Sequence, residues 1–180
     1  MNQRRAAKTV RWAQKVMGHM IGEPIVAVSG FRSQGIPTTG GAASVAASLL
    51  SPVAGAAAAN RRVNEISAQE IARTWQAQGA TAAERLPKVA LYLVATKTRL
   101  VATDSSHTTG KPSMVIAEYA LSEVESMTKE RSTATKRISQ LSFTDGSSVL
   151  LESPRGGAYY PQDFLPPLAE LLAAAHARRN

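Results

Sequence analysis

The 180-residue chain has no cysteine, and its three histidines stand far apart in the sequence. The lack of cysteine excludes a disulfide framework and a thiolate-bound metal, and scattered histidines offer no local pair of metal ligands. We therefore expect no metal and no cofactor. Aromatic residues make up 5% of the chain and are not interleaved with cations, so the sequence offers no stacking platform for single-stranded nucleic acid.

Motifs that carry a reaction are also missing. The run Thr109–Lys111 has the end of a phosphate-binding loop, but Ser105 stands where that motif begins with glycine, and Pro112 replaces its hydroxyl residue. The run Asp104–His107 places an acid, hydroxyls and a base side by side, whereas catalytic groups normally converge from distant segments. We expect a polar hairpin turn there, and a protein that is not an enzyme.

Acidic side chains are absent from residues 1–20, which carry five of the basic ones, in a chain of net charge +8. No apolar run separates these charges, as it would in a secretory leader, so we expect a cytoplasmic protein. Most of the cations recur at helical spacing, and alanine, valine and methionine side chains run along the opposite side. Residues 1–22 therefore predict a basic amphipathic helix. The cations at helical spacing are Arg4, Lys8, Arg11 and Lys15.

Three interpretations of this helix remain open. It can pack its apolar side on its own domain and leave the basic side to solvent. It can instead lie on an anionic membrane, with Trp12 near the boundary between its two faces and each cation contributing about 1 kcal/mol. The third interpretation is contact with nucleic acid.

The next part of the chain is one strand followed by an uncharged segment. Residues 24–31 have the β-branched density of a strand. Residues 40–59 are mostly alanine, glycine and serine, with Ser51 and Pro52 suited to begin a second short helix. With the helix expected to follow, residues 40–79 form a helical insertion. One interpretation is a helical hairpin covered by its own domain or by a partner, which can be a second copy of the chain bound through residues 40–78. The other is a segment inserted in a membrane.

From residue 88 onward the pattern is that of strands. Lys97 and Thr98 separate the first two tightly enough for a hairpin, and Asp145-Gly146 is a strong turn signal between the last two. A helix with Leu168 and Leu172 on its apolar face follows, with Asp163 as its cap and Pro166 and Pro167 in its first turn. The expected strands are residues 88–96, 99–104, 114–119, 122–127, 137–144 and 147–152.

This order of elements resembles the bacterial pleckstrin-homology and GRAM-like domain family. The resemblance rests on the 91–104 hairpin, the LSEV step at 121–124, the 141–152 hairpin and the closing helix. It implies an α+β fold, a seven-strand, partly open barrel capped by a C-terminal helix. The domain would span residues 23–180, built from strand 24–31 and residues 88–180. In that family the first two strands usually form a hairpin, whereas about 56 residues separate them here.

The resemblance implies that anionic lipid headgroups or peptides bind at a rim of loops. The candidate loop is 129–137, whose cations and hydroxyls are donors that phosphate oxygens accept; simple solvation of a charged loop is the alternative. Lys97 and Arg99, at a hairpin tip, are a second candidate, for which protection of a sheet edge is the alternative. The candidate contact residues are Arg4, Lys8, Arg11, Trp12, Lys15, Lys129, Arg131, Lys136 and Arg137.

The sequence therefore predicts a non-catalytic binding module, peripheral at the inner face of the membrane, whose partner is anionic lipid or a protein. The alternative function is that of a basic nucleic-acid-binding protein, for which the net charge is the main support.

Overall fold

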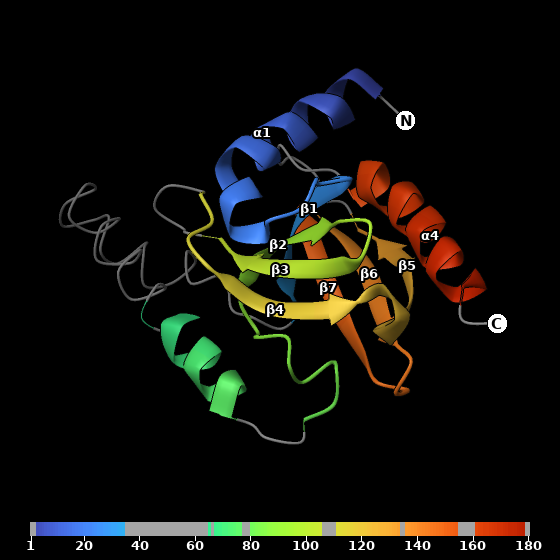
Figure 1. Ribbon diagram of the computed structural model, residues 1–180. Coiled ribbons are helices and arrows are strands. Elements are labelled where there is room, and N and C mark those ends of the chain that lie inside the picture. The colour runs from blue at the N-terminus through green and yellow to red at the C-terminus, as the bar shows by residue number, and fades with distance from the viewer. Residues whose placement is uncertain are drawn as a thin grey trace.

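The computed structural model describes residues 3–34, 65, 67–76, 80–105, 111–133, 136–154 and 161–178. These residues form an α+β fold with one sheet, as predicted (Figure 1). The predicted hairpin at 40–59 lies outside the described residues. A helix covers residues 67–76. The other elements are α1 (Gln3–Ile21), β1 (Ala27–Ser33), β2 (Ala90–Ala95), β3 (Arg99–Asp104), β4 (Val115–Ala120), the 3-10 turn η1 (Leu121–Glu123), β5 (Val124–Ser132), β6 (Lys136–Phe143), β7 (Ser148–Pro154) and α4 (Pro161–Ala177).

The seven strands form one antiparallel sheet in the order β4-β3-β2-β1-β7-β6-β5. The first strand is therefore central, paired with β2 on one side and β7 on the other. β4 and β5 are the two edges, yet only the three residues of η1 separate them in the chain. The sheet must curl to bring its edges that close, and it remains open between them (Figure 1).

The middle of the sheet is buried on both faces. In β2, Leu91 and Leu93 belong to one apolar cluster, and Tyr92 and Val94 belong to another on the opposite face. A strand covered on both sides cannot alternate apolar with polar residues. This is why β2 is a continuous apolar run rather than an alternating one.

The inner face of the curled sheet packs against α4. Phe164, Leu168 and Leu172 are buried at helical spacing, and the Phe164 ring lies 5.8 Å from that of Phe31 in β1. The helix begins at Pro161, two residues before the predicted cap, because proline needs no amide partner in the first turn. Pro166 and Pro167 therefore stand inside the helix, and the prediction that they occupy its first turn is wrong.

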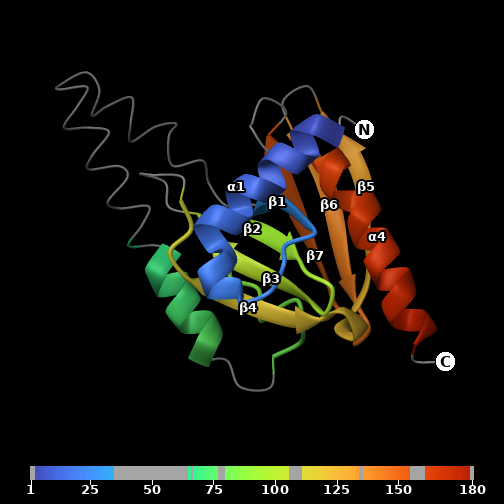
Figure 2. The same ribbon diagram turned by 45° about the horizontal axis from the view of Figure 1, so that its top comes forward.

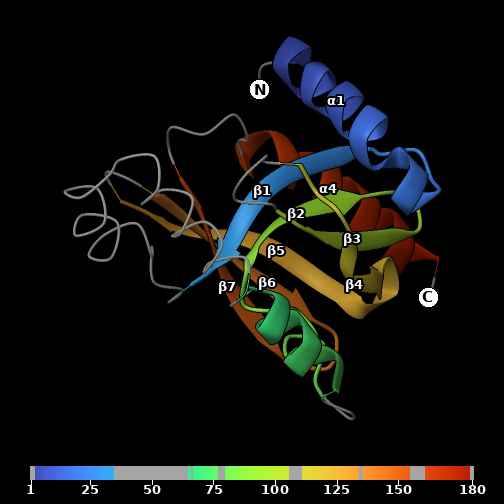
Figure 3. The ribbon, with the colours of Figure 1, turned by 90° about the vertical axis from the view of Figure 1, so that its left-hand side faces the viewer.

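The outer face of the sheet packs against α1, which lies across β1 in Figure 3 and contacts apolar residues of β1, β2 and β3. Ala13, Met17 and Ile21, spaced four apart, are fully or almost fully buried against Val94 and Val101. Of the three interpretations of this helix, packing on its own domain is confirmed for the apolar face. That contact does not decide what the basic face binds.

Candidate functional site

The basic face of α1 is the most strongly charged exposed feature that the sequence predicted. All four cations at helical spacing are exposed, and the helix contains no Asp or Glu. At 1.5 Å per residue, the row from Arg4 to Lys15 is about 16 Å long. Figure 2 shows this helix lying on the outside of the sheet, with its N-terminus beside the start of α4. The four side chains are thus held in one line on a fixed support.

These four cations differ from the fifth cation of the helix. Among the described residues, no ion pair involves Arg4, Lys8, Arg11 or Lys15. Arg5, in contrast, lies 2.8 Å from a carboxylate oxygen of Asp163, whose side chain is 10% exposed. Arg5 therefore joins α1 to α4, and the other four remain available to an external anion.

Trp12 lies at the interface between helix and sheet. Its ring is half-buried, with its centroid 5.7 Å from that of Tyr92 in β2. An aromatic ring anchors a helix in a membrane only when it can enter the headgroup region. Trp12 already packs against the protein, so its predicted membrane contact would be made by its exposed edge alone.

The predicted loop at 129–137 is wrong in its conformation. β5 continues to Ser132 and β6 begins at Lys136, so most of the segment is paired strand, with Lys129 opposite Ser139 and Arg131 opposite Ile138. Charged and hydroxyl residues are typical of loops, and this composition led to the prediction. They also suit the exposed end of an edge hairpin, where charge discourages pairing with another sheet.

The four cations of this hairpin do not form one site. Lys129 and Arg131 are exposed on the edge strand β5, and Arg137 is half-buried. Lys136 binds the carboxylate of Glu152, which is 4% exposed and is also held by Arg32. Lys136 therefore serves the packing of β1, β6 and β7.

The second predicted candidate, Lys97 with Arg99, also divides into two roles. Lys97 is exposed. Arg99 lies 2.9 Å from Glu23 and 2.6 Å from Glu118, and it donates a hydrogen bond to the Ile21 carbonyl at 2.6 Å. Arg99 thus fixes the C-terminal end of α1 on the sheet, and only Lys97 is left for an external partner.

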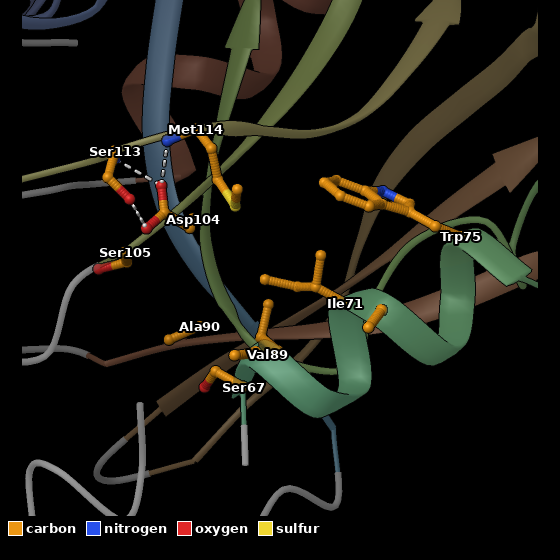
Figure 4. Close-up of a pocket in the computed structure, with 11 residues that line it drawn as sticks. Ser67, Ile71, Trp75, Val89, Ala90, Asp104, Ser105, Ser113 and Met114 are labelled. Atoms are coloured by element: carbon orange, nitrogen blue, oxygen red, sulfur yellow. Dashed lines mark hydrogen bonds between the residues drawn. The ribbon is translucent and has the colours of Figure 1, made fainter. Parts of the chain in front are cut away.

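A hollow that the sequence analysis missed lies between helix 67–76 and the ends of β2, β3 and β4 (Figure 4). Its volume is about 350 Å³, and Ile71, Trp75, Val89 and Met114 form most of its apolar wall. Ile71 and Trp75, four apart and both apolar, were the available signal, because that spacing places them on one side of a helix.

Asp104 lies at the polar end of this hollow. Its carboxylate accepts hydrogen bonds from the Ser113 amide, the Ser113 hydroxyl and the Met114 amide, at 2.6, 2.7 and 2.8 Å (Figure 4). These three donors tie the end of β3 to the start of β4. Asp104 therefore joins the two strands, and His107, which follows it in the sequence, lies outside the described residues.

In the described part of the chain, no three His, Asp or Glu side chains gather closely enough to hold a metal ion. None of the described helices is both long and apolar enough to span a bilayer. Comparison of the chain with protein-family models gives no match, and comparison with curated proteins gives none either. The case for a function therefore rests on the exposed cations of α1 and on the fold that supports them.

Proposed function

We propose that this chain is a non-catalytic binding module that associates with anionic lipid surfaces through the outer face of α1. One observation carries the proposal: four exposed cations form a row on a helix without acidic residues, whose opposite face is fixed to the sheet. Anionic lipid attracts such a row, and no acidic side chain of the same helix opposes the attraction.

We further propose that the fold is a pleckstrin-homology-like barrel. Three features support this assignment: the strand order, the short η1 connection that forces the sheet to curl, and the closing helix on the inner face. A fold does not by itself set a function, so the proposed role rests on the row of cations that the barrel supports.

The expected affinity is low. At about 1 kcal/mol for each cation near an anionic surface, the row contributes roughly 4 kcal/mol, which corresponds to a millimolar dissociation constant. The apolar face of α1, which would add insertion energy in a free amphipathic helix, is already buried against Val94 and Val101. We therefore propose a reversible contact that several copies or a second ligand would strengthen.

Sedimentation with vesicles tests the proposal. The full chain should bind vesicles of phosphatidylcholine mixed with phosphatidylserine and should not bind phosphatidylcholine alone, and the binding should weaken with salt. The variant K8E/R11E should lose most of it. K88E/K111E, which alters the net charge equally at two exposed lysines elsewhere, should retain it.

Substitution is required because deletion of α1 would uncover the apolar residues of β2 and β3 beneath it. Equal binding to neutral and anionic vesicles, or full binding by K8E/R11E, would contradict the proposal. If vesicles do not bind but duplex DNA is shifted by the wild type and not by K8E/R11E, the row of cations belongs to a nucleic-acid-binding protein instead.

A further inference from the structure

Helix 67–76 rests on the rest of the protein through few side chains. Of its ten described residues, only Ile71 is buried. Four residues later, Trp75 is 57% exposed, and its indole N–H donates a hydrogen bond to the Ile116 carbonyl at 3.1 Å. The helix is thus held chiefly by an aliphatic side chain and a tryptophan at positions i and i+4.

Hollows lie on both sides of this line of contact. The hollow in Figure 4, about 350 Å³, opens between the Ile71 and Trp75 side of the helix and Met114. A second one, about 590 Å³, separates Glu70, Arg73 and Thr74 from Leu86 and Val149. Both hollows are open to solvent, so few protein atoms contact the helix on either side of this line. The seat of this helix is therefore narrow and poorly packed.

The helix covers an edge of the sheet. β4 is paired with β3 on one side and is the last strand in the order, so its other side has no strand neighbour in the described part of the chain. The indole N–H of Trp75 donates a hydrogen bond to the Ile116 carbonyl on this strand. Edge strands that lose such a cover present unpaired backbone groups and attract other chains. The surface beside the free side of β4 is thus a groove that helix 67–76 already occupies.

We propose that the groove along β4 is a helix-binding site that helix 67–76 occupies in competition with an external helix. The partner is a helix with an aliphatic residue and a tryptophan four positions later, because that pair makes the seated contact here. Among the described residues, the hollow beside β4 is lined by apolar and hydroxyl residues with Asp104, and the second hollow adds Glu84 and Lys88. The partner is therefore defined by its apolar anchor pair, with polar positions on either side of it. This site is independent of α1 and of the proposed lipid contact.

The test uses the full chain and, as the probe, a fluorescent peptide with the sequence of residues 65–78. The internal helix competes at high local concentration, so the wild type should bind the peptide weakly. The variant I71A/W75A weakens the competitor and should bind at least ten-fold more tightly. Q69A, at an exposed residue of the same helix that lines neither hollow, should behave as the wild type.

Two results would overturn the proposal. One is the same affinity, or no binding, for the wild type and a folded I71A/W75A variant. The other comes from hydrogen exchange on the wild type, which does not depend on any variant: we expect amides of 67–76 to exchange at least a hundred-fold faster than those of β2, and equal protection would show a firmly seated helix. A peptide with both anchor residues replaced by alanine should not bind, and equal binding by it would also contradict the assignment.

Discussion

Glu152 shows how one buried side chain joins separate parts of the sheet. It stands on β7 and binds Arg32 of β1 and Lys136 of β6. Burial alone would raise the pKa of Glu152, but the hydrogen bond and charge of Lys136, together with Arg32, hold this pKa below its ordinary value. The carboxylate is therefore charged in the fold.

We expect Glu152→Gln to lower the free energy of unfolding at neutral pH by about 2 kcal/mol, because two charge-assisted hydrogen bonds lose their acceptor charge. The folded-state pKa is lower than the unfolded one, so this stabilisation is present above the unfolded pKa and is lost as the pH falls through the folded pKa. The difference between variant and wild type should therefore shrink in acid. Urea unfolding of both proteins at neutral and acidic pH measures this difference in unfolding free energy.

The control for Glu152 is Glu118→Gln, at a side chain that is 44% exposed and pairs with Arg99. We expect a change of about 0.5 kcal/mol or less, because exposed ion pairs contribute little. Equal losses in both variants would show that burial of Glu152 adds nothing to its ion pairs.

Gly146 occupies a backbone conformation that other residues avoid. Its φ is +82°, it follows Asp145 in the β6–β7 turn, and a Cβ at this position would contact nothing within 4 Å. We expect Gly146→Ala to lower the unfolding free energy by about 1 kcal/mol through backbone strain alone, and Gly146→Asn to cost less, since asparagine tolerates this region. Thermal unfolding compares the two. A larger loss for asparagine would point to a steric cause.

At the scale of elements, the sequence predicted the strands well because their signals are local. Residues 99–104 match β3, and the hairpin across Asp145-Gly146 is confirmed between β6 and β7. The surface against which α1 packs could not be predicted in this way. Val10, Ala13 and Met17 make the same apolar stripe whether the helix meets a membrane or a sheet, and only the apolar residues on the outer face of β2 and β3 decide between them.

Other parts of the site depend on pairing that is not local. The charges of 129–137 do not reveal that Lys136 binds Glu152 across the β6–β7 pair. Nor does the sequence around Arg99 reveal that its guanidinium donates a hydrogen bond to the carbonyl of Ile21, the last residue of α1. The same holds for Arg5, which lies 158 residues before its partner Asp163. Cations were therefore recognised as candidates, but structural and available ones could not be separated from the sequence.

The two faces of α1 should respond differently to substitution. Met17 is fully buried against the sheet, and Lys15 is exposed on the basic face. We expect Met17→Ala to lower the unfolding free energy by about 2–4 kcal/mol and Lys15→Ala to change it by less than about 0.5 kcal/mol. Denaturant titration measures both. Similar, small losses would mean that α1 does not belong to the cooperative core.

For the whole molecule, the curled sheet with one helix on each face implies that a membrane contact leaves the fold unchanged. Trp12 is held against Tyr92, so it should not enter the lipid. In the variant W75F, whose only tryptophan is Trp12, we expect no blue shift of the emission when anionic vesicles bind the protein. A marked blue shift on binding would show that α1 leaves the sheet and inserts.

The central position of β1 also governs how the chain is made. Residues 27–33 can pair with β2 early in synthesis, but Arg32 meets Glu152 only after 120 further residues have been added. The nascent chain therefore exposes the β7 side of β1 until β7 and α4 have been made, and contacts of such long range form slowly. We therefore expect chaperone demand to be greatest while the nascent chain still lacks β7 and α4.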